Sequence, residues 1–159
     1  MEVSIAEIKL KNPKVPQSMA MDEFQKWLDY KKTKITLVFN QSSSKDEDED
    51  EEESSKATTE IIEAIMDGNL IVNEDLSLSY NLMFPVKDDS GQTALGSLTM
   101  KPRLTADEVA QATKGVTKKD PQGVFIGYLH VLSGEVKGLI RKIDSQDYSL
   151  LQKIVMYFL

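Results

Sequence analysis

Residues 144–159 read Asp-Ser-Gln-Asp-Tyr-Ser-Leu-Leu-Gln-Lys-Ile-Val-Met-Tyr-Phe-Leu and carry the clearest structural signal in the chain. Asp144 and Asp147 are three residues apart, so we expect Asp144 to cap a helix and Asp147 to lie in its first turn, with water reaching both carboxylates. An apolar stripe follows at helical spacing: Tyr148, Leu151, Ile154, Val155 and Phe158. The pattern predicts an amphipathic helix that closes the protein's own core or binds a partner.

The apolar character of this helix continues to the last residue of the sequence. We expect Leu151, Ile154 and Val155, which lie in mid-helix, to be buried in the core. Helix ends fray unless something holds them, so we expect the last three residues to contribute both to the core and to the binding of a partner. The full set of candidate partner-binding residues adds two aromatic residues of an earlier predicted helix: Tyr157, Phe158, Leu159, Phe24 and Trp27.

Alternation of apolar and polar residues upstream predicts a β-hairpin. One strand carries apolar residues at every second position: Leu76, Leu78, Tyr80, Leu82 and Phe84. The segment Asp88–Gln92 turns the chain, and Thr93–Met100 returns with Leu98 and Met100 in phase and Leu95 out of phase. The loop is longer than a two-residue turn.

Helix signals occupy the rest of the second half. Thr105 and Glu108 have the spacing of a capping box that opens a helix from Ala106 to Lys114. Asp120-Pro121 begins a second helix, which ends at Gly134. Residues 135–143 are expected to be a linker into the terminal helix. Gly123 and Gly127 are four apart, which either permits a close helix approach or is incidental.

The first half contains weaker signals. Ser18 can cap a helix from Met19 to about Lys32, and residues 35–39 (Ile-Thr-Leu-Val-Phe) are typical of a strand. A further helix is predicted from Thr58 to Asp67, with Gly68 as its end. In the first of these helices Phe24, Trp27 and Leu28 share a face, and in the second Ile61, Ile62 and Ile65 are expected to be buried.

Eight consecutive acids, Asp46–Glu53, interrupt this half. Without them the formal net charge changes from −7 to +1. Like charges repel and have nothing to bury, so we expect residues 41–57 to form a disordered acidic loop between residues 1–40 and a domain of residues 58–159. Three roles stay open for the run: a solubilising insertion, a bait for a basic partner surface, and mimicry of a nucleic-acid backbone.

Several functional classes find no support in the sequence. It contains no cysteine and one histidine, His130, with no serine or carboxylate in a local catalytic motif. No glycine loop or spaced ligand set predicts a cofactor or a metal. We also expect no secretory signal, no membrane span and no nucleic-acid binding. The sequence therefore predicts a binding protein rather than an enzyme, with an α+β fold: a β-hairpin or small antiparallel sheet followed by three helices.

The second half resembles a known family. The pattern that starts at Leu139 and continues through Asp144, Asp147, Tyr148, Leu151, Gln152, Ile154, Phe158 and Leu159 is similar to the C-terminal signature of bacteriophage tail assembly chaperones. The segment Leu98–Pro102, followed by Thr105–Glu108, is similar to the strand, basic-proline turn and first helix of that family. The resemblance covers about Ser77 to Leu159.

The resemblance implies a chaperone that binds the aggregation-prone tape measure protein in the host cytoplasm and is absent from the mature virion. The tail tube protein and a second copy of the chain are further candidate partners. Two other functions stay open, a structural subunit of a phage particle and an acidic mimic of nucleic acid.

Overall fold

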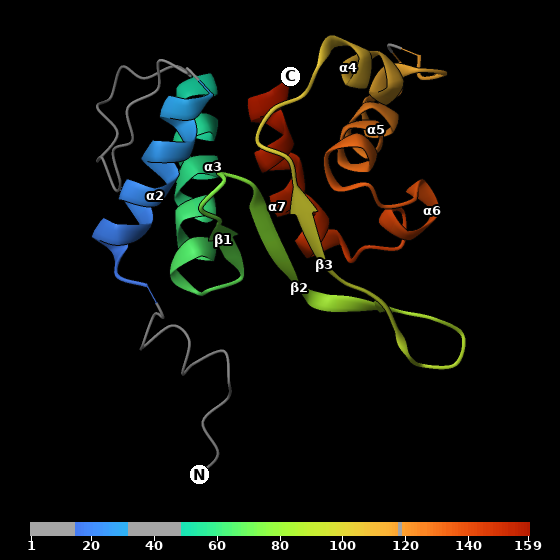
Figure 1. Ribbon diagram of the computed structural model, residues 1–159, viewed down its shortest axis with the longest axis horizontal. Coiled ribbons are helices and arrows are strands. Elements are labelled where there is room, and N and C mark those ends of the chain that lie inside the picture. Colours follow the sequence, from blue (N-terminus) through green and yellow to red (C-terminus); the bar gives the residue numbers. More distant parts are fainter. Residues whose placement is uncertain (1–14, 32–48, 118) are drawn as a thin grey trace. The chain divides into compact units, whose positions relative to one another are not determined.

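The computed structural model describes residues 15–31, 49–117 and 119–159 (Figure 1). Helices and an antiparallel hairpin confirm the predicted α+β class. The chain divides into two compact units, Met1–Val72 and Asn73–Leu159, so the second unit begins later than the predicted boundary at residue 58. The strand predicted at residues 35–39 and the acidic residues 46–48 lie outside the described residues.

The first unit pairs two helices, α2 (Gln17–Tyr30) and α3 (Glu49–Met66), and also contains the short strand β1 (Leu70–Val72). The predicted cap at Ser18 is wrong, because the helix begins at Gln17 with Pro16 in the capping position and the Pro16 carbonyl accepts from the amide of Ala20. Ile61, Ile62 and Ile65 are buried as predicted, and Phe24, Trp27 and Leu28, which share a face of α2, are buried as well.

Helix α3 begins earlier than the sequence predicted. Residues 49–57 were expected to be part of a disordered loop, and they are helical instead. Glutamate has a high helix propensity, and acidic residues are favoured at the positive end of a helix, so the acidic run is compatible with a helix start. The predicted end is correct, because Gly68 has a left-handed φ of 79° and its amide bonds to the Ile65 carbonyl.

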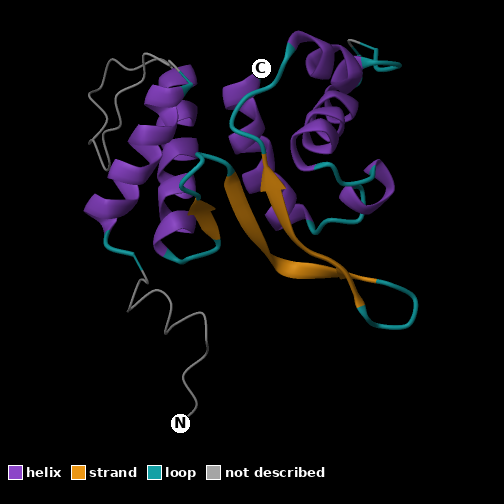
Figure 2. Ribbon diagram, in the orientation of Figure 1, coloured by secondary structure: helices purple, strands orange, loops and turns teal. Residues whose placement is uncertain are grey.

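The second unit contains the predicted hairpin, formed by β2 (Leu78–Lys87) and β3 (Thr93–Met100), which pair antiparallel. The hairpin loop projects away from the helices of this unit (Figure 2). The Asp88 carboxylate holds the loop by accepting from the amides of Ser90 and Gln92, at 2.9 Å each. A side chain rather than a two-residue turn therefore sets the loop geometry.

The two strands are out of step in the middle of the hairpin. Asn81 pairs with Ser97 and the next pair is Val86 with Leu95, so β2 advances by five residues while β3 advances by two. This bulge changes which side chains face the core. Phe84, predicted in line with the buried residues, is 49% exposed, whereas Leu95, predicted out of phase, is buried.

Four helices and a final 3₁₀ turn follow the hairpin: α4 (Ala106–Thr113), α5 (Pro121–Ser133), α6 (Lys137–Ile140), α7 (Ser145–Val155) and η1 (Met156–Phe158). Asp120 caps α5 through the amide of Gly123, and Gly134 ends α5 in the left-handed region with a φ of 76°. The three predicted helices are therefore present. The single turn α6 lies in the segment predicted to be a linker.

Gly127 lets α5 and α4 come into backbone contact. A Cβ atom at this position would lie 1.9 Å from the Ala112 carbonyl oxygen, which is far inside any allowed contact. Backbone atoms cannot rotate aside as a side chain does. The question left open for this glycine is settled in favour of a close helix approach. A Cβ at Gly123 would instead meet the capping carboxylate of Asp120, at 2.5 Å.

We predict that Gly127→Ala destabilises the second unit by about 1–3 kcal/mol or more, because α4 and α5 must move apart. Gly138→Ala is the matched control, since Gly138 also lies in a helix but a Cβ there would meet nothing within 4 Å. The control is expected to be neutral or stabilising by up to about 1 kcal/mol. Urea denaturation followed by circular dichroism measures both, and equal stabilities would contradict the close-contact argument.

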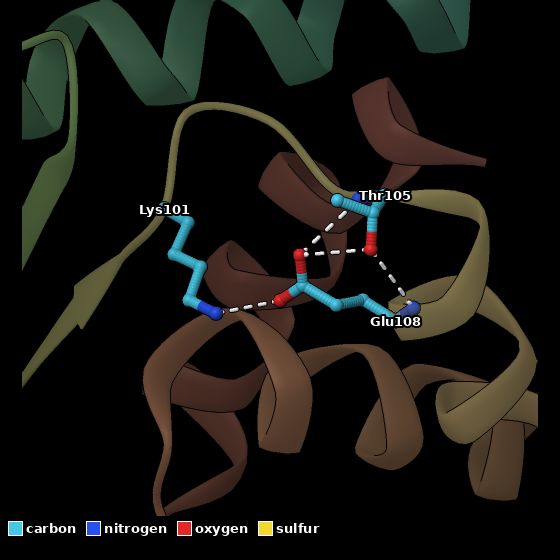
Figure 3. A network of polar contacts seen from close by, with 3 residues as sticks. All are labelled: Lys101, Thr105 and Glu108. Carbon is cyan, nitrogen blue, oxygen red and sulfur yellow. Dashed lines mark hydrogen bonds and ion pairs between the residues drawn. The ribbon is translucent and has the colours of Figure 1, made fainter.

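The predicted capping box joins α4 to the end of β3. The Glu108 amide donates to the Thr105 hydroxyl and the Thr105 amide donates to the Glu108 carboxylate, at 3.2 Å each. Lys101, just after β3, donates to the second carboxylate oxygen of Glu108 (Figure 3). The Lys101 contact and then the Thr105 amide lower the pKa of Glu108 below its usual value of 4.5.

This pKa shift predicts an acid-sensitive contribution to stability. A carboxyl group whose pKa is lowered by folding stabilises the protein above its unfolded pKa, and the effect disappears as the pH falls through the folded pKa. Between neutral pH and about pH 3, wild type should therefore lose more stability than Glu108→Gln. Denaturation curves at matched pH values measure this difference, and parallel pH profiles of the two proteins would contradict it.

Candidate partner-binding site

The first turn of α7 holds a buried carboxylate. Asp147 is 0% exposed, so the expectation that water reaches its carboxylate is wrong. Its Oδ1 accepts from the Tyr80 hydroxyl at 2.7 Å and from the Met83 amide at 2.9 Å, and its Oδ2 accepts from the Phe84 amide at 3.0 Å. The neighbouring Asp144 behaves as predicted and caps α7 through the amide of Gln146.

The position of Asp147 explains how the β2 bulge is stabilised. Met83 and Phe84 lie in the bulge, where the register between β2 and β3 shifts. Their amides therefore lack the regular hydrogen bonds between the two strands. A buried amide without an acceptor costs about 1–3 kcal/mol, and the carboxylate supplies acceptors for both. Burial of the carboxylate is offset by three donors and by the positive end of α7.

Tyr80 shares this buried network. This residue of β2 is 0% exposed and belongs to the core. Burial, and then the hydrogen bond to the negatively charged Asp147, raise the pKa of the Tyr80 hydroxyl above its usual value of 10. The hydroxyl is therefore a stable hydrogen-bond donor at physiological pH.

The bulge presents apolar side chains to solvent. Met83 and Phe84 are 47% and 49% exposed although their backbone amides are fixed by Asp147. Sequence reasoning missed this pair, because the carboxylate that holds it lies more than sixty residues away in the chain. A surface aromatic on a fixed backbone loses little freedom when it binds, which suits a contact site.

The C-terminal candidates occupy the other end of α7. Leu151, Ile154 and Val155 are buried, as predicted for the middle of the helix. The α-helix ends at Val155, and the remaining residues form the 3₁₀ turn η1. Tyr157 and Phe158 are half-buried, whereas Met156 and Leu159 are 60% and 61% exposed. The end of the chain thus contributes both to the fold and to the apolar surface.

Phe24 and Trp27 do not lie on an accessible surface. Their rings stack with centroids 5.5 Å apart, and both side chains are buried in the first unit. Helix α2 packs this face against α3, which explains the burial. The structure therefore corrects their selection as partner-binding residues.

Side-chain amides connect α7 to α5. The Gln122 carbonyl oxygen accepts from the Tyr148 hydroxyl at 2.9 Å and from the Gln152 amide at 3.1 Å. Tyr148 is half-buried and does not belong to the buried stripe predicted for α7. It adds a polar contact at the edge of the packed surface instead.

His130 has a structural contact at the end of α5. Its Nδ1 lies 2.7 Å from the Glu135 carbonyl oxygen, an acceptor, so Nδ1 carries the proton and donates it. Among the residues that the structure describes, no group of three or more histidine or acidic side chains could hold a metal ion. No helix in the described part of the chain is long and apolar enough to cross a membrane.

No protein-family model, curated protein or solved structure matches this chain.

We predict that Asp147→Asn lowers the free energy of unfolding of the second unit by about 2–4 kcal/mol, because the amide supplies one acceptor oxygen for three donors. Asp144→Asn is the matched control and should change it by less than about 0.5 kcal/mol, since asparagine caps helices as well as aspartate. Hydrogen exchange at the Met83 and Phe84 amides should accelerate in Asp147→Asn alone. Equal effects of the two substitutions would show that the buried network contributes nothing specific.

Proposed function

We propose that the protein is a tail assembly chaperone that binds the tape measure protein of a tailed bacteriophage in the host cytoplasm. It would hold this long protein in solution while tail tube subunits assemble, and would be absent from the finished virion. The observation that carries the proposal is the C-terminal pattern from Leu139 to Leu159, which is similar to the signature of that family.

The behaviour of the pattern residues in the structure supports the proposal. Several of them have defined positions in the fold, whereas Leu159 is 61% exposed. Asp144 caps α7, Asp147 holds the β2 bulge, and Leu151 and Ile154 fill the core. Gln152 and Tyr148 connect α7 to α5. A family with a common fold would need residues with such structural roles at these positions.

The exposed apolar residues suit a protein that binds an aggregation-prone client. Met156 and Leu159 at the end of α7, and Met83 and Phe84 at the bulge, are 47–61% exposed. Methionine is flexible and polarizable, so it adapts to clients that vary in shape. Their separation into small groups limits self-aggregation, which a single large apolar patch would promote.

The test combines co-expression with surface substitutions. Wild type co-expressed with its cognate tape measure protein should move that protein from the pellet to the soluble fraction. The double variant Met156→Ser with Leu159→Ser should bind the client at least tenfold more weakly, a loss of about 1.4 kcal/mol or more of binding free energy. Less of the client should then reach the soluble fraction. Both side chains are mostly exposed, so unfolding stability should change by less than about 1 kcal/mol.

Val136→Ser is the matched control, because Val136 is 58% exposed but lies before α6 rather than at the end of α7. This control should solubilise the client as wild type does. A client that stays insoluble at every expression ratio, together with recovery of this protein in purified particles, would favour the structural-subunit function. Equal losses for the control and the double variant would remove the C-terminal residues from the binding site.

A further inference from the structure

The second unit has one buried and two exposed methionines. Met100 in β3 is 0% exposed, whereas Met83 in β2 and Met156 in η1 are 47% and 60% exposed. The sequence has seven methionines and no cysteine, so methionine thioethers are its only sulfur groups. An oxidant in solution that attacks sulfur should therefore react first with the exposed methionines.

Each exposed methionine belongs to one of the two small apolar groups of this unit. Met83 adjoins the exposed Phe84 at the β2 bulge. Met156 lies in the turn η1 and is followed by the exposed Leu159. Both groups belong to the surface that we propose binds the client, so a chemical change of either methionine would change that surface.

Neither exposed methionine belongs to the core of the unit. Met83 is held through its backbone amide, which donates to the Asp147 carboxylate at 2.9 Å. Met156 follows Val155, the last buried residue of α7. A modification of these two side chains would therefore alter the apolar surface and leave the bulge and the packing of α7 in place.

We propose that Met83 and Met156 are oxidation sites through which hydrogen peroxide weakens client binding; this inference rests on the proposed function. Peroxide transfers one oxygen atom to the thioether sulfur: an S–O bond forms, the O–O bond breaks, sulfur loses two electrons, and the peroxide leaves as water. The resulting sulfoxide is polar, so covering it with an apolar client removes its bound water without a compensating hydrogen bond. Oxidation thus opposes binding at both apolar groups.

In the bound state, the client should shield both side chains from the oxidant. The full chain, alone and in the complex purified after co-expression with its cognate tape measure protein, is treated with hydrogen peroxide, and peptide mass spectrometry measures oxidation at each methionine. In the protein alone, Met83 and Met156 should oxidise before Met100. In the complex they should oxidise more slowly, whereas Met19, which is exposed in α2 of the first unit, should oxidise at an unchanged rate. Equal rates at Met83 and Met156 with and without the client would overturn the assignment.

A second experiment measures the effect on binding. The tape measure protein is diluted from urea, and light scattering gives the concentration of this protein that halves client aggregation. Peroxide treatment of wild type should raise that concentration about tenfold or more and leave the thermal unfolding transition unchanged. The double variant Met83→Leu with Met156→Leu keeps the apolar volume but cannot form a sulfoxide, so it should act as untreated wild type does, before and after peroxide.

Met19→Leu is the matched control and should lose activity with peroxide as wild type does, since Met19 lies outside the two apolar groups. An untreated wild type that does not suppress client aggregation contradicts the proposed function and with it this inference. An untreated wild type that suppresses aggregation but is insensitive to peroxide contradicts this inference alone. Equal peroxide sensitivity of wild type and the double leucine variant also overturns it.

Discussion

The second unit depends on the contact between the Asp147 carboxylate and the backbone of β2. One side chain from the first turn of α7 supplies acceptors for a tyrosine hydroxyl and two consecutive amides of the bulge. Without it, the exposed pair Met83 and Phe84 would have a mobile backbone, and α7 would lose its polar connection to the hairpin. Three bonds to one buried charge also fix the rotation of α7, and so determine which of its residues enter the core.

The other contacts of this unit are arranged around the fixed α7. Leu151, Ile154 and Val155 enter the core, and Gln122 joins α5 to the outer side of α7. The backbone of α4 packs directly against α5 at Gly127. At the other end of α5, the Leu132 carbonyl accepts a hydrogen bond from the amide of Lys101, which follows β3. Each step uses backbone contact or a buried polar bond, which specifies geometry more sharply than apolar packing alone.

Local features of this fold could be predicted from the sequence because their causes lie within a few residues. The Thr105 and Glu108 capping box, the Asp120 and Asp144 caps and the glycine ends of α3 and α5 are of this kind. The bulge could not be predicted, because its acceptor is remote in the chain. The same gap explains why Phe84 and Leu95 were assigned to the wrong faces. For Phe24 and Trp27, helical periodicity identified a face but could not say what α3 would cover.

The two ends of α7 have different physical requirements, and this difference bears on the proposed function. At the first turn, Asp147 accepts hydrogen bonds from a specific set of donors, so substitution of Asp147 should lower the free energy of unfolding. At the last turn, Met156 and Leu159 contribute little to the packing of the core, since both remain mostly exposed. Exposed apolar residues raise the risk of aggregation and contribute little to stability, and we propose a binding role for these two. The pattern that resembles the tail assembly chaperones covers both ends, so it contains residues that build the fold and residues that we propose bind the client.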